Sequence, residues 1–224
     1  MKFSVLTLFP ELIRTVCAES IIGRAVEAGH IAVEAHNIRD YSTDKHRRVD
    51  DTPYGGGMGM LMAAPPVYDC YSNVKKHLNG SVRTIYMSPQ GSLLTQKKVK
   101  ELRKYDNLVI VCGHYEGIDV RVIEEICDEE ISIGNYVLTG GELPACILID
   151  AVARTCPGVL SDEECYENES VSCGMLEYPQ YTRPYDFHGK KVPEVLLGGN
   201  HKEIAKWRER EALALTLKKR PDLL

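Results

Sequence analysis

The sequence lacks long apolar segments and an excess of positive charge, and each absence argues against one class of protein. None of the apolar stretches in its 224 residues is long enough to cross a bilayer. The opening residues MKFSVLTLFPELI alternate with Ser4 and Thr7 before Pro10, which suits a first strand better than an export signal. The net charge of −5 argues against a general nucleic-acid coat but allows local basic surfaces. We therefore expect a cytoplasmic protein without a membrane partner.

Common metal-binding and nucleotide-binding motifs are also absent. The eight cysteines show no C-x-x-C spacing, and no pair of histidines lies at zinc-ligand spacing. Most of these cysteines lie in apolar runs, so we interpret them as reduced core residues and predict no all-protein metal site. No G-x-x-x-x-G-K-[ST] pattern occurs, and Met60 stands where a G-x-G-x-x-G fingerprint needs its third glycine. These absences exclude a P-loop enzyme and argue against a dinucleotide-binding motif.

What the sequence does contain is an alternation of short apolar runs with longer amphipathic runs, typical of an α/β protein with a parallel sheet. The wholly apolar run at 108–112 predicts a central strand. The segment 40–64 has no periodicity, and loops of that length are usually functional or disordered. We expect strands at 3–9, 31–36, 83–87, 108–112 and 130–133, and helices at 11–28, 65–78, 96–105, 143–153 and 202–219.

An acidic segment divides the chain into two predicted domains. Residues 161–170 carry five acidic side chains and almost no apolar ones, which indicates a linker. We predict an α/β domain over 1–160, an acidic linker over 161–175 and a small, mainly helical domain over 176–224. Basic residues cluster in the predicted helices 96–105 and 202–219, where solvated faces and nucleic-acid contacts are both open interpretations.

Glycine-rich segments follow the ends of three predicted strands, at Ser88–Gly91, Gly113–Gly117 and Ile133–Gly141. The carboxyl ends of parallel strands meet at one edge of a sheet, so these segments should converge there. Glycine lets a planar ligand approach backbone N–H and C=O groups closely. The pattern predicts a ligand site, while plain tight turns remain the alternative.

Six longer motifs carry a specific resemblance. They occur in order and at matching spacing, and they resemble those of the bacterial tRNA (guanine-N1)-methyltransferases of the TrmD family. The motifs are VDDTPYGGGMGM (49–60), MSPQG (87–91), VCGHYEGIDVR (111–121), SIGNYVLTGGELPA (132–145), IDAVAR (149–154) and LEYPQYTRP (176–184).

The resemblance implies a fold and a methyl donor. The family belongs to the SPOUT class, so we expect a parallel-sheet domain with a deep trefoil knot, a helical tRNA-binding domain shorter than the family's, and a homodimer. S-adenosylmethionine binds in the knotted loops of the family. The resemblance assigns donor contacts to Tyr86, Ser88, Pro89, Gly113, Tyr115, Glu116, Gly117, Ile133, Gly134, Asn135, Tyr136, Val137, Leu138, Gly140, Gly141 and Pro144.

The resemblance also implies the acceptor chemistry. The acceptor is N1 of the guanine 3′-adjacent to the anticodon, position 37, and this nitrogen must lose its proton before it can attack, so a carboxylate base is needed. The base falls on Glu169, with Glu163 and Glu167 as neighbouring candidates, and Arg154 is expected to stabilise the charge that develops on guanine O6. Without the resemblance, the acids would be ordinary linker charges and the arginine a common residue at a helix C-terminus.

Contacts to the tRNA follow from the same resemblance. Asp50 and Glu177 match acids that contact the base beside the target, whereas Arg183, Lys45, Arg47, Arg48 and the C-terminal basic residues are candidates for phosphate contacts. The family is associated with Mg²⁺, which often binds through few carboxylates and substrate oxygens. The alternatives are a SPOUT methyltransferase that acts on a different RNA and a non-catalytic module that binds S-adenosylmethionine.

Overall fold

The predicted parallel sheet is confirmed in the computed structural model, which describes residues 1–161, 170–171 and 174–224. Residues Met1–Ser161 form one compact unit and Asp162–Leu224 a second. In the first unit, five strands pair in parallel in the order β2-β1-β6-β5-β7. They are β1 (Lys2–Thr7), β2 (Ala32–Asn37), β5 (Val82–Leu93), β6 (Asn107–Cys112) and β7 (Glu129–Ser132).

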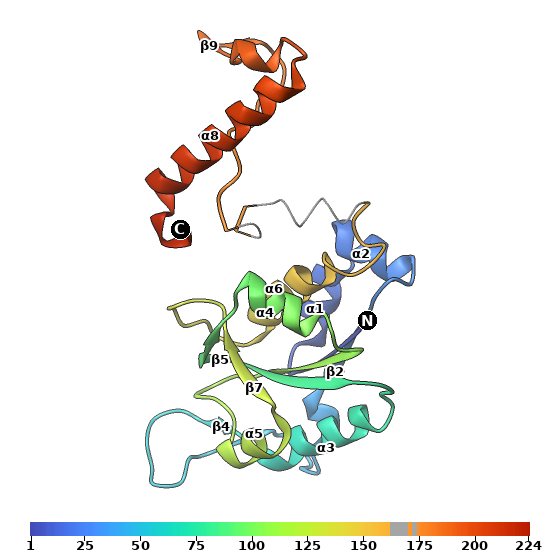
Figure 1. Cartoon of the computed structure of the whole chain (residues 1–224). Helices are drawn as coiled ribbons and strands as arrows, with labels where there is room; N and C mark the ends of the chain where they lie inside the picture. The colour runs from blue at the N-terminus through green and yellow to red at the C-terminus, as the bar shows by residue number, and fades with distance from the viewer. Residues whose placement is uncertain (162–169, 172–173) are drawn as a thin grey trace. The chain divides into compact units, whose positions relative to one another are not determined.

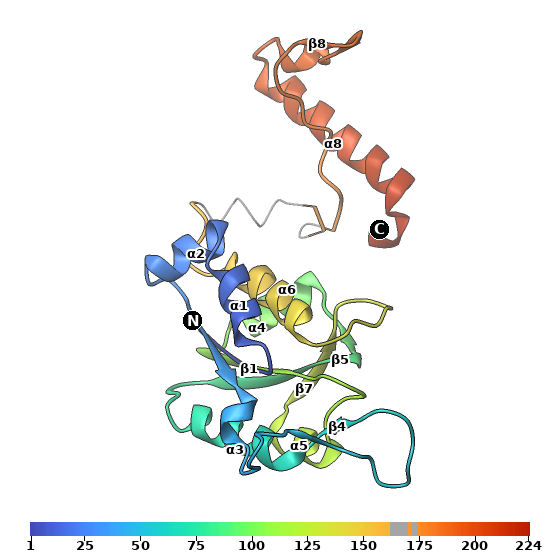
Figure 2. The same cartoon turned by 180° about the vertical axis from the view of Figure 1, so that it is seen from behind.

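Helices cover both faces of the sheet (Figures 1 and 2). Four of them bury apolar residues in the core on one face, and two do so in the core on the other. The first set is α1 (Pro10–Cys17), α2 (Ser20–Glu27), α4 (Gln96–Leu102) and α6 (Glu142–Ala153), and the second is α3 (Ala64–Lys75) and α5 (Val120–Ile126).

Strand β6 lies at the centre of the sheet, as its apolar sequence predicts. All six of its residues are buried. Alternate side chains of a strand point to opposite faces, so Leu108 and Ile110 enter one core while Val109 and Val111 enter the other. A strand covered on both faces has no polar side, which explains its continuous apolar run.

The helix expected over 11–28 is wrong as a single element, because the chain breaks between α1 and α2. Glu19 is extended and Ser20 has a φ of 57°, so the backbone leaves the helical path there. Gly23 then packs directly against the carbonyl of Ala18, where a side chain would collide with backbone atoms. This close approach is a backbone contact across the break itself, so the apolar periodicity of the two helices could not reveal it.

The turn expected at Ser88–Gly91 lies inside a strand. Strand β5 runs to Leu93, and Met87 and Ser92 both pair with Ile131 of β7, so the residues between them bulge out of the ladder. The bulge leaves Ser88 buried and brings the segment beside the ends of β6 and β7. The pattern therefore identified the irregular segment but not its continuation as a strand.

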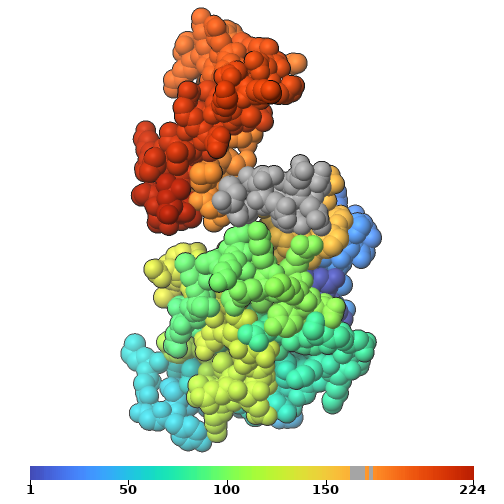
Figure 3. Space-filling view, in the orientation of Figure 1, coloured from blue at the N-terminus to red at the C-terminus, as the bar shows by residue number. Residues whose placement is uncertain are grey.

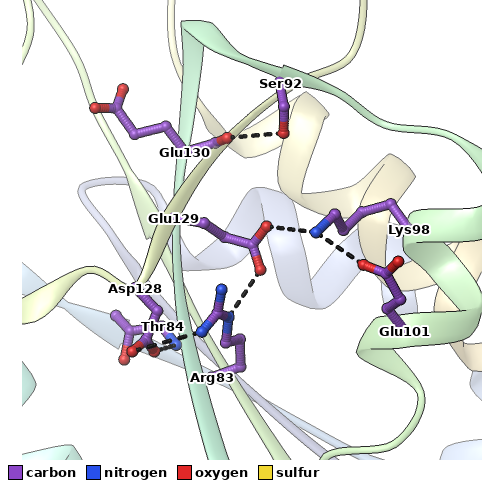
Figure 4. Close-up of polar contacts among 8 residues, drawn as sticks. All are labelled: Arg83, Thr84, Ser92, Lys98, Glu101, Asp128, Glu129 and Glu130. Atoms are coloured by element: carbon purple, nitrogen blue, oxygen red, sulfur yellow. Dashed lines mark hydrogen bonds and ion pairs between the residues drawn. The ribbon is translucent and has the colours of Figure 1, made fainter.

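An ion-pair cluster fastens β7 to β5 and α4 (Figure 4). The carboxylate of Glu129 accepts from Arg83 Nε at 2.8 Å and pairs with Lys98 Nζ at 2.9 Å. Burial raises the pKa of Glu129, but the hydrogen bonds from Arg83 and Lys98 outweigh burial, so the pKa is lowered. Lys98 also pairs with Glu101 on its own helix. Helix α4 begins as expected, because the Thr95 hydroxyl accepts from the N–H of Lys98.

The long segment after β2 contains little regular structure, as its lack of periodicity predicts. A 3-10 turn, η1 (Ile38–Tyr41), precedes a short antiparallel pair, β3 (Asp50–Asp51) and β4 (Leu61–Met62). Between the two strands, the side chains of Tyr54 and Met58 are almost fully exposed. Figure 3 shows this glycine-rich loop, coloured cyan, at the lower left edge of the first unit.

The second unit contains a partly exposed cluster of three aromatic residues. Helix α8 (His201–Lys219) starts at Asn200, whose side chain accepts from Glu203 N–H. Tyr178 and Tyr181 pack against Trp207, with ring centroids 6.4 and 6.3 Å away. The remaining elements are β8 (Asp186–Phe187), β9 (Lys190–Lys191), η2 (Glu194–Leu196) and η3 (Pro221–Leu223). Across both units, no helix that the structure describes is long and apolar enough to span a membrane.

Candidate functional site

The three glycine-rich segments meet around a cavity of about 410 Å³. It lies where β5, β6 and β7 end or bulge, as expected for a ligand site of a parallel sheet. The predicted donor residues that line it are Tyr86, Ser88, Pro89, Gly113, Tyr115, Glu116, Gly117, Ile133, Gly134, Tyr136, Val137, Leu138, Gly140, Gly141 and Pro144. Asn135 belongs to the same segment but is not among the lining residues.

Gly141 brings the start of α6 into direct contact with the end of β6. Its N–H donates to the carbonyl of Gly113 at 3.0 Å. A Cβ at Gly141 would lie 2.8 Å from the Cα of Cys112, closer than real side chains approach backbone atoms. Two of the three cavity segments are therefore joined by a backbone contact that only glycine allows.

The segment 113–117 is held in an unusual conformation. Tyr115 has a φ of 59°, in the left-handed region that non-glycine residues rarely adopt. Gly117 N–H donates to His114 C=O, and Glu116 N–H donates to Met60 C=O, each at 3.0 Å. These bonds tie the segment to itself and to the glycine-rich loop between β3 and β4.

Tyr86 supplies a neutral hydroxyl to the cavity wall. Burial raises the pKa of this phenol to about 12, with a further rise from nearby Glu130. The hydroxyl therefore stays protonated at neutral pH. It can act there as a hydrogen-bond donor or acceptor but not as a base.

Sequence reasoning missed several residues of this cavity. His114 lies between two residues that were identified, and its Nε2 lies 2.7 Å from Glu142 Oε2. Its position within the motif VCGHYEGIDVR was the signal that could have found it. The further lining residues are Met87, Gln90, Ile118, Val120, Ile123, Glu130, Ile131, Ser132 and Thr139.

Arg154 does not line this cavity. It is the C-cap of α6, whereas Gly141 is the N-cap. A helix of that length separates its two ends by about 18 Å at 1.5 Å per residue. Arg154 instead borders a second recess of about 200 Å³ beside α1 and α2, together with Cys17, Cys146 and Asp150.

The other predicted site residues occupy several parts of the chain. Glu169, Glu163 and Glu167 lie outside the described residues. In the first unit, Asp50 is half-buried in β3.

In the second unit, Glu177 accepts from the hydroxyl of Ser170 at 3.3 Å, and Arg183 is exposed. Of the basic residues near β3, Arg47 pairs with Asp40 and Arg48 with Asp44. Arg48 thereby lowers the pKa of Asp44. These two guanidinium groups are partly neutralised by their own segment.

The interpretation of the cysteines is confirmed for six of them, which are free thiols and mostly buried. Burial raises the pKa of Cys70 and of Cys127 to about 12, so both stay protonated. Cys165 and Cys173 lie outside the described residues. Within the described part of the chain, no group of three or more His, Cys, Asp or Glu side chains is arranged to hold a metal ion.

Comparison with known proteins gives a consistent result over the whole length of the chain. The family model described as tRNA (guanine-1)-methyltransferase TrmD matches residues 1–224. A protein of Ruminiclostridium cellulolyticum named tRNA (guanine-N(1)-)-methyltransferase is 60% identical over 223 residues, covering 100% of this chain and 96% of the relative. Proteins of the same name from Lachnospira eligens and Clostridioides difficile are 56% and 51% identical, and 94% and 97% of their lengths are covered.

Proposed function

Because this chain belongs to the tRNA (guanine-1)-methyltransferase TrmD family, it is an S-adenosylmethionine-dependent tRNA methyltransferase, and we propose that it methylates N1 of the guanine 3′-adjacent to the anticodon, position 37. The observation that carries this proposal is the family match over residues 1–224. The six motifs are part of that match, and the glycine-lined cavity is consistent with a site for the methyl donor. The knot and a Mg²⁺ requirement remain predictions from the resemblance, and a cytoplasmic location remains a prediction from the sequence pattern.

The described residues fit a bound methyl donor. The cavity of about 410 Å³ lies in the usual size range for small-molecule sites. Backbone groups of the three segments can pair with the edges of an adenine ring, and Leu138 and Pro144 offer apolar surface to its faces. When bound there, the donor would supply a methyl group carried on a sulfonium sulfur, which would leave as a neutral thioether when the guanine nitrogen takes the methyl group.

The chain's own residues then have two tasks. A carboxylate takes the N1 proton of guanine, and we assign this to Glu169. As N1 loses its proton, negative charge builds on O6, and we assign the stabilising donor to the guanidinium of Arg154. No protein nucleophile is needed, since the N1–methyl bond forms as the sulfur–methyl bond breaks, and positioning supplies much of the rate.

The separation of Arg154 from the cavity supports a homodimer with shared sites. Because the two ends of α6 lie about 18 Å apart, Arg154 of one copy lies far from the Gly141 end of that copy's own cavity. We take as the pairing face the exposed apolar side chains on α6 and on the segment around α1, which packs against it: Phe9, Leu12, Val16, Ile21, Leu143 and Ile147. In an antiparallel two-fold pairing across that face, the end of α6 in each copy would meet the start of α6 in the other.

Mixing two inactive variants tests this arrangement. Arg154→Ala removes the guanidinium and Gly141→Val blocks the donor cavity, so each homodimer should be inactive. Random pairing at equal concentrations makes about half of the dimers hybrids. In each hybrid, one of the two sites has both an intact cavity and an intact Arg154, so we expect about a quarter of wild-type activity. A mixture that stays inactive although the subunits exchange, as judged by native mass spectrometry, would contradict shared sites.

Mass-spectrometric mapping of methylguanosine in tRNA tests the proposed target. The enzyme should methylate a transcript with guanine at position 37, and equal methylation of a transcript with adenine there would overturn the proposal. Methylation at another site or on another RNA would instead support the SPOUT alternative. Donor binding without transfer to any RNA would support the non-catalytic module.

The base is tested by three matched substitutions in the acidic segment. Glu169→Gln should bind the donor normally and lose most methyl transfer, whereas Glu163→Gln and Glu167→Gln should transfer at near wild-type rates. Near-normal turnover of Glu169→Gln would remove Glu169 as the base, and loss in one of the other variants would identify its replacement.

For the tRNA itself, we assign base contacts to Asp50 and Glu177 and phosphate contacts to Arg183 and the basic residues of α8. Phosphate contacts position the RNA, so their loss should weaken binding to all tRNAs alike. Loss of a base contact should instead relax the choice of the neighbouring nucleotide. Binding of matched transcripts at several salt concentrations separates the two effects.

A further inference from the structure

A buried carboxylate joins three segments next to the donor cavity. Glu142, the first residue of α6, is only 3% exposed. Its Oε1 accepts from the hydroxyl of Thr7 at 2.6 Å, and its Oε2 lies 2.7 Å from Nε2 of His114. Thr7 ends β1 and His114 follows β6, so one side chain links two neighbouring strand ends to the helix.

The hydrogen bonds of this cluster have a defined direction. Phe9 N–H donates to the Thr7 hydroxyl at 2.9 Å, so the hydroxyl proton is available for Glu142. A carboxylate only accepts, so the hydrogen between Glu142 and His114 is carried by Nε2 of the imidazole. Burying a charge is costly unless it is fully paired, and here both oxygens have partners at the favourable N-terminus of a helix.

The cluster sits where the cavity segments touch. His114 lines the cavity and pairs with Gly140 in an antiparallel bridge. A Cβ at Gly140 would lie 2.6 Å from Glu142 Oε2 and would also collide with the His114 ring. The hydrogen-bonded pair of Glu142 and His114 therefore fills the space that a side chain at position 140 would need. The next residue, Tyr115, holds its left-handed backbone conformation, which persists only where the surroundings enforce it.

From these contacts we propose that Thr7, Glu142 and His114 are positioning residues for the methyl donor. Glu142 fixes the ring of His114 in its Nε2–H form and so holds segment 113–117 against segment 138–141. Thr7 orients the carboxylate from the opposite side. This inference rests on the proposed function, because it assumes that the cavity binds S-adenosylmethionine.

Calorimetric binding of S-adenosylmethionine to the full chain, without tRNA, tests the inference. Glu142→Gln keeps the side-chain volume but cannot accept from both partners, and Thr7→Val removes the hydroxyl at nearly constant shape. A charge-assisted hydrogen bond is strong enough that we expect each change to raise the donor Kd by about tenfold. Thr7→Ser should restore binding. The matched control is Glu34→Gln, which alters another Glu–His pair, with His36 on β2, away from the cavity.

Two further readouts separate positioning from general stability. In steady-state assays, Glu142→Gln should raise the KM for the donor by about tenfold and change kcat much less. The ¹⁵N shifts of His114 in the wild-type protein should report a hydrogen on Nε2 in the absence of donor, a measurement that does not depend on whether a variant folds.

The outcomes are distinguishable. If the wild-type protein binds no S-adenosylmethionine, the proposed function fails. If the wild-type protein binds it, while Glu142→Gln and Thr7→Val bind within about twofold of wild type, only the positioning role fails. A wild-type His114 without a hydrogen on Nε2 would also overturn it.

Discussion

Substituting Gly141 by alanine tests the geometry of the donor cavity with a single methyl group. Gly141 has φ −83° and ψ −5°, a conformation that alanine adopts freely, so only contacts decide the outcome. The new Cβ would lie 2.8 Å from Cys112 Cα and 3.1 Å from Gly113 N. Carbon atoms normally approach to about 3.5 Å, so something must move by roughly 0.7 Å.

The strand is the less able of the two neighbours to move. Cys112 is fully buried in the centre of the sheet and pairs with Met87 of β5. The loop before α6 must therefore shift, and the Gly141–Gly113 hydrogen bond lengthens with it. Overpacking of this kind costs about 1–3 kcal/mol. If this free energy is lost from donor binding, the donor Kd rises roughly five- to 150-fold. Gly141→Val adds two further methyl groups and should abolish binding.

Calorimetry with S-adenosylmethionine measures the affinity, and thermal melting separates a damaged site from a damaged fold. A loss of 1 kcal/mol in a unit of this size lowers Tm by about 2–4 °C. Gly198→Ala is the control, because its Cβ would meet nothing closer than 4.0 Å and its φ is not positive. A Kd for Gly141→Ala within about twofold of wild type would refute the contact argument.

Three further predictions concern stability and catalysis. Glu129→Gln should lower the free energy of unfolding by about 1–2 kcal/mol at neutral pH. Because the folded-state pKa of Glu129 is lowered from 4.5, the difference in stability between wild type and variant should be full above that value and shrink as the pH falls through the lower folded pKa. A difference in urea titrations that does not change with pH would contradict this. Leu148→Ala empties a fully buried site in α6 and should cost about 2–5 kcal/mol in the same assay, whereas Leu93→Ala, at a residue 56% exposed, should cost far less. Arg154→Lys should lower kcat roughly 100-fold without changing the donor Kd, and Arg121→Lys should leave both unchanged; equal kcat values would remove Arg154 from the mechanism.

The sheet could be predicted from sequence because its strands are short, apolar and separated by clear breaks. After its first residue, Asn107, strand β6 is wholly apolar, and that pattern is typical of a strand covered on both faces. Helix α5 was missed although Asp119 caps it by accepting from Arg121 N–H, because its seven residues are too few for a periodicity signal. The break between α1 and α2 depends on the backbone of Glu19 and Ser20 and on the contact of Gly23 with Ala18, which an apolar periodicity does not encode.

The cavity was predictable for a different reason. Parallel strands direct their carboxyl ends to one edge, so glycine-rich segments after β5, β6 and β7 had to converge. The identity of the ligand came from the family resemblance, not from this geometry. His114 and Glu142 escaped notice because their significance lies in a contact between residues 28 positions apart. Such a contact has no periodicity, so only the folded chain reveals it.

Helix α6 separates Arg154 from the cavity segment at Gly141, although the two residues lie in neighbouring motifs. The motifs around Gly141 and Arg154 are close in sequence, which favours one shared site. A continuous helix is rigid, however, and it carries its two ends about 18 Å apart. The same rigidity makes an antiparallel pair of such helices a fixed spacer between two donor cavities. If Arg154 of one copy acts at the donor cavity of the other copy, the length of α6 determines whether Arg154 reaches that cavity. A deletion of one helical turn within α6 should then abolish methyl transfer even if donor binding survives, and retained transfer would refute that role.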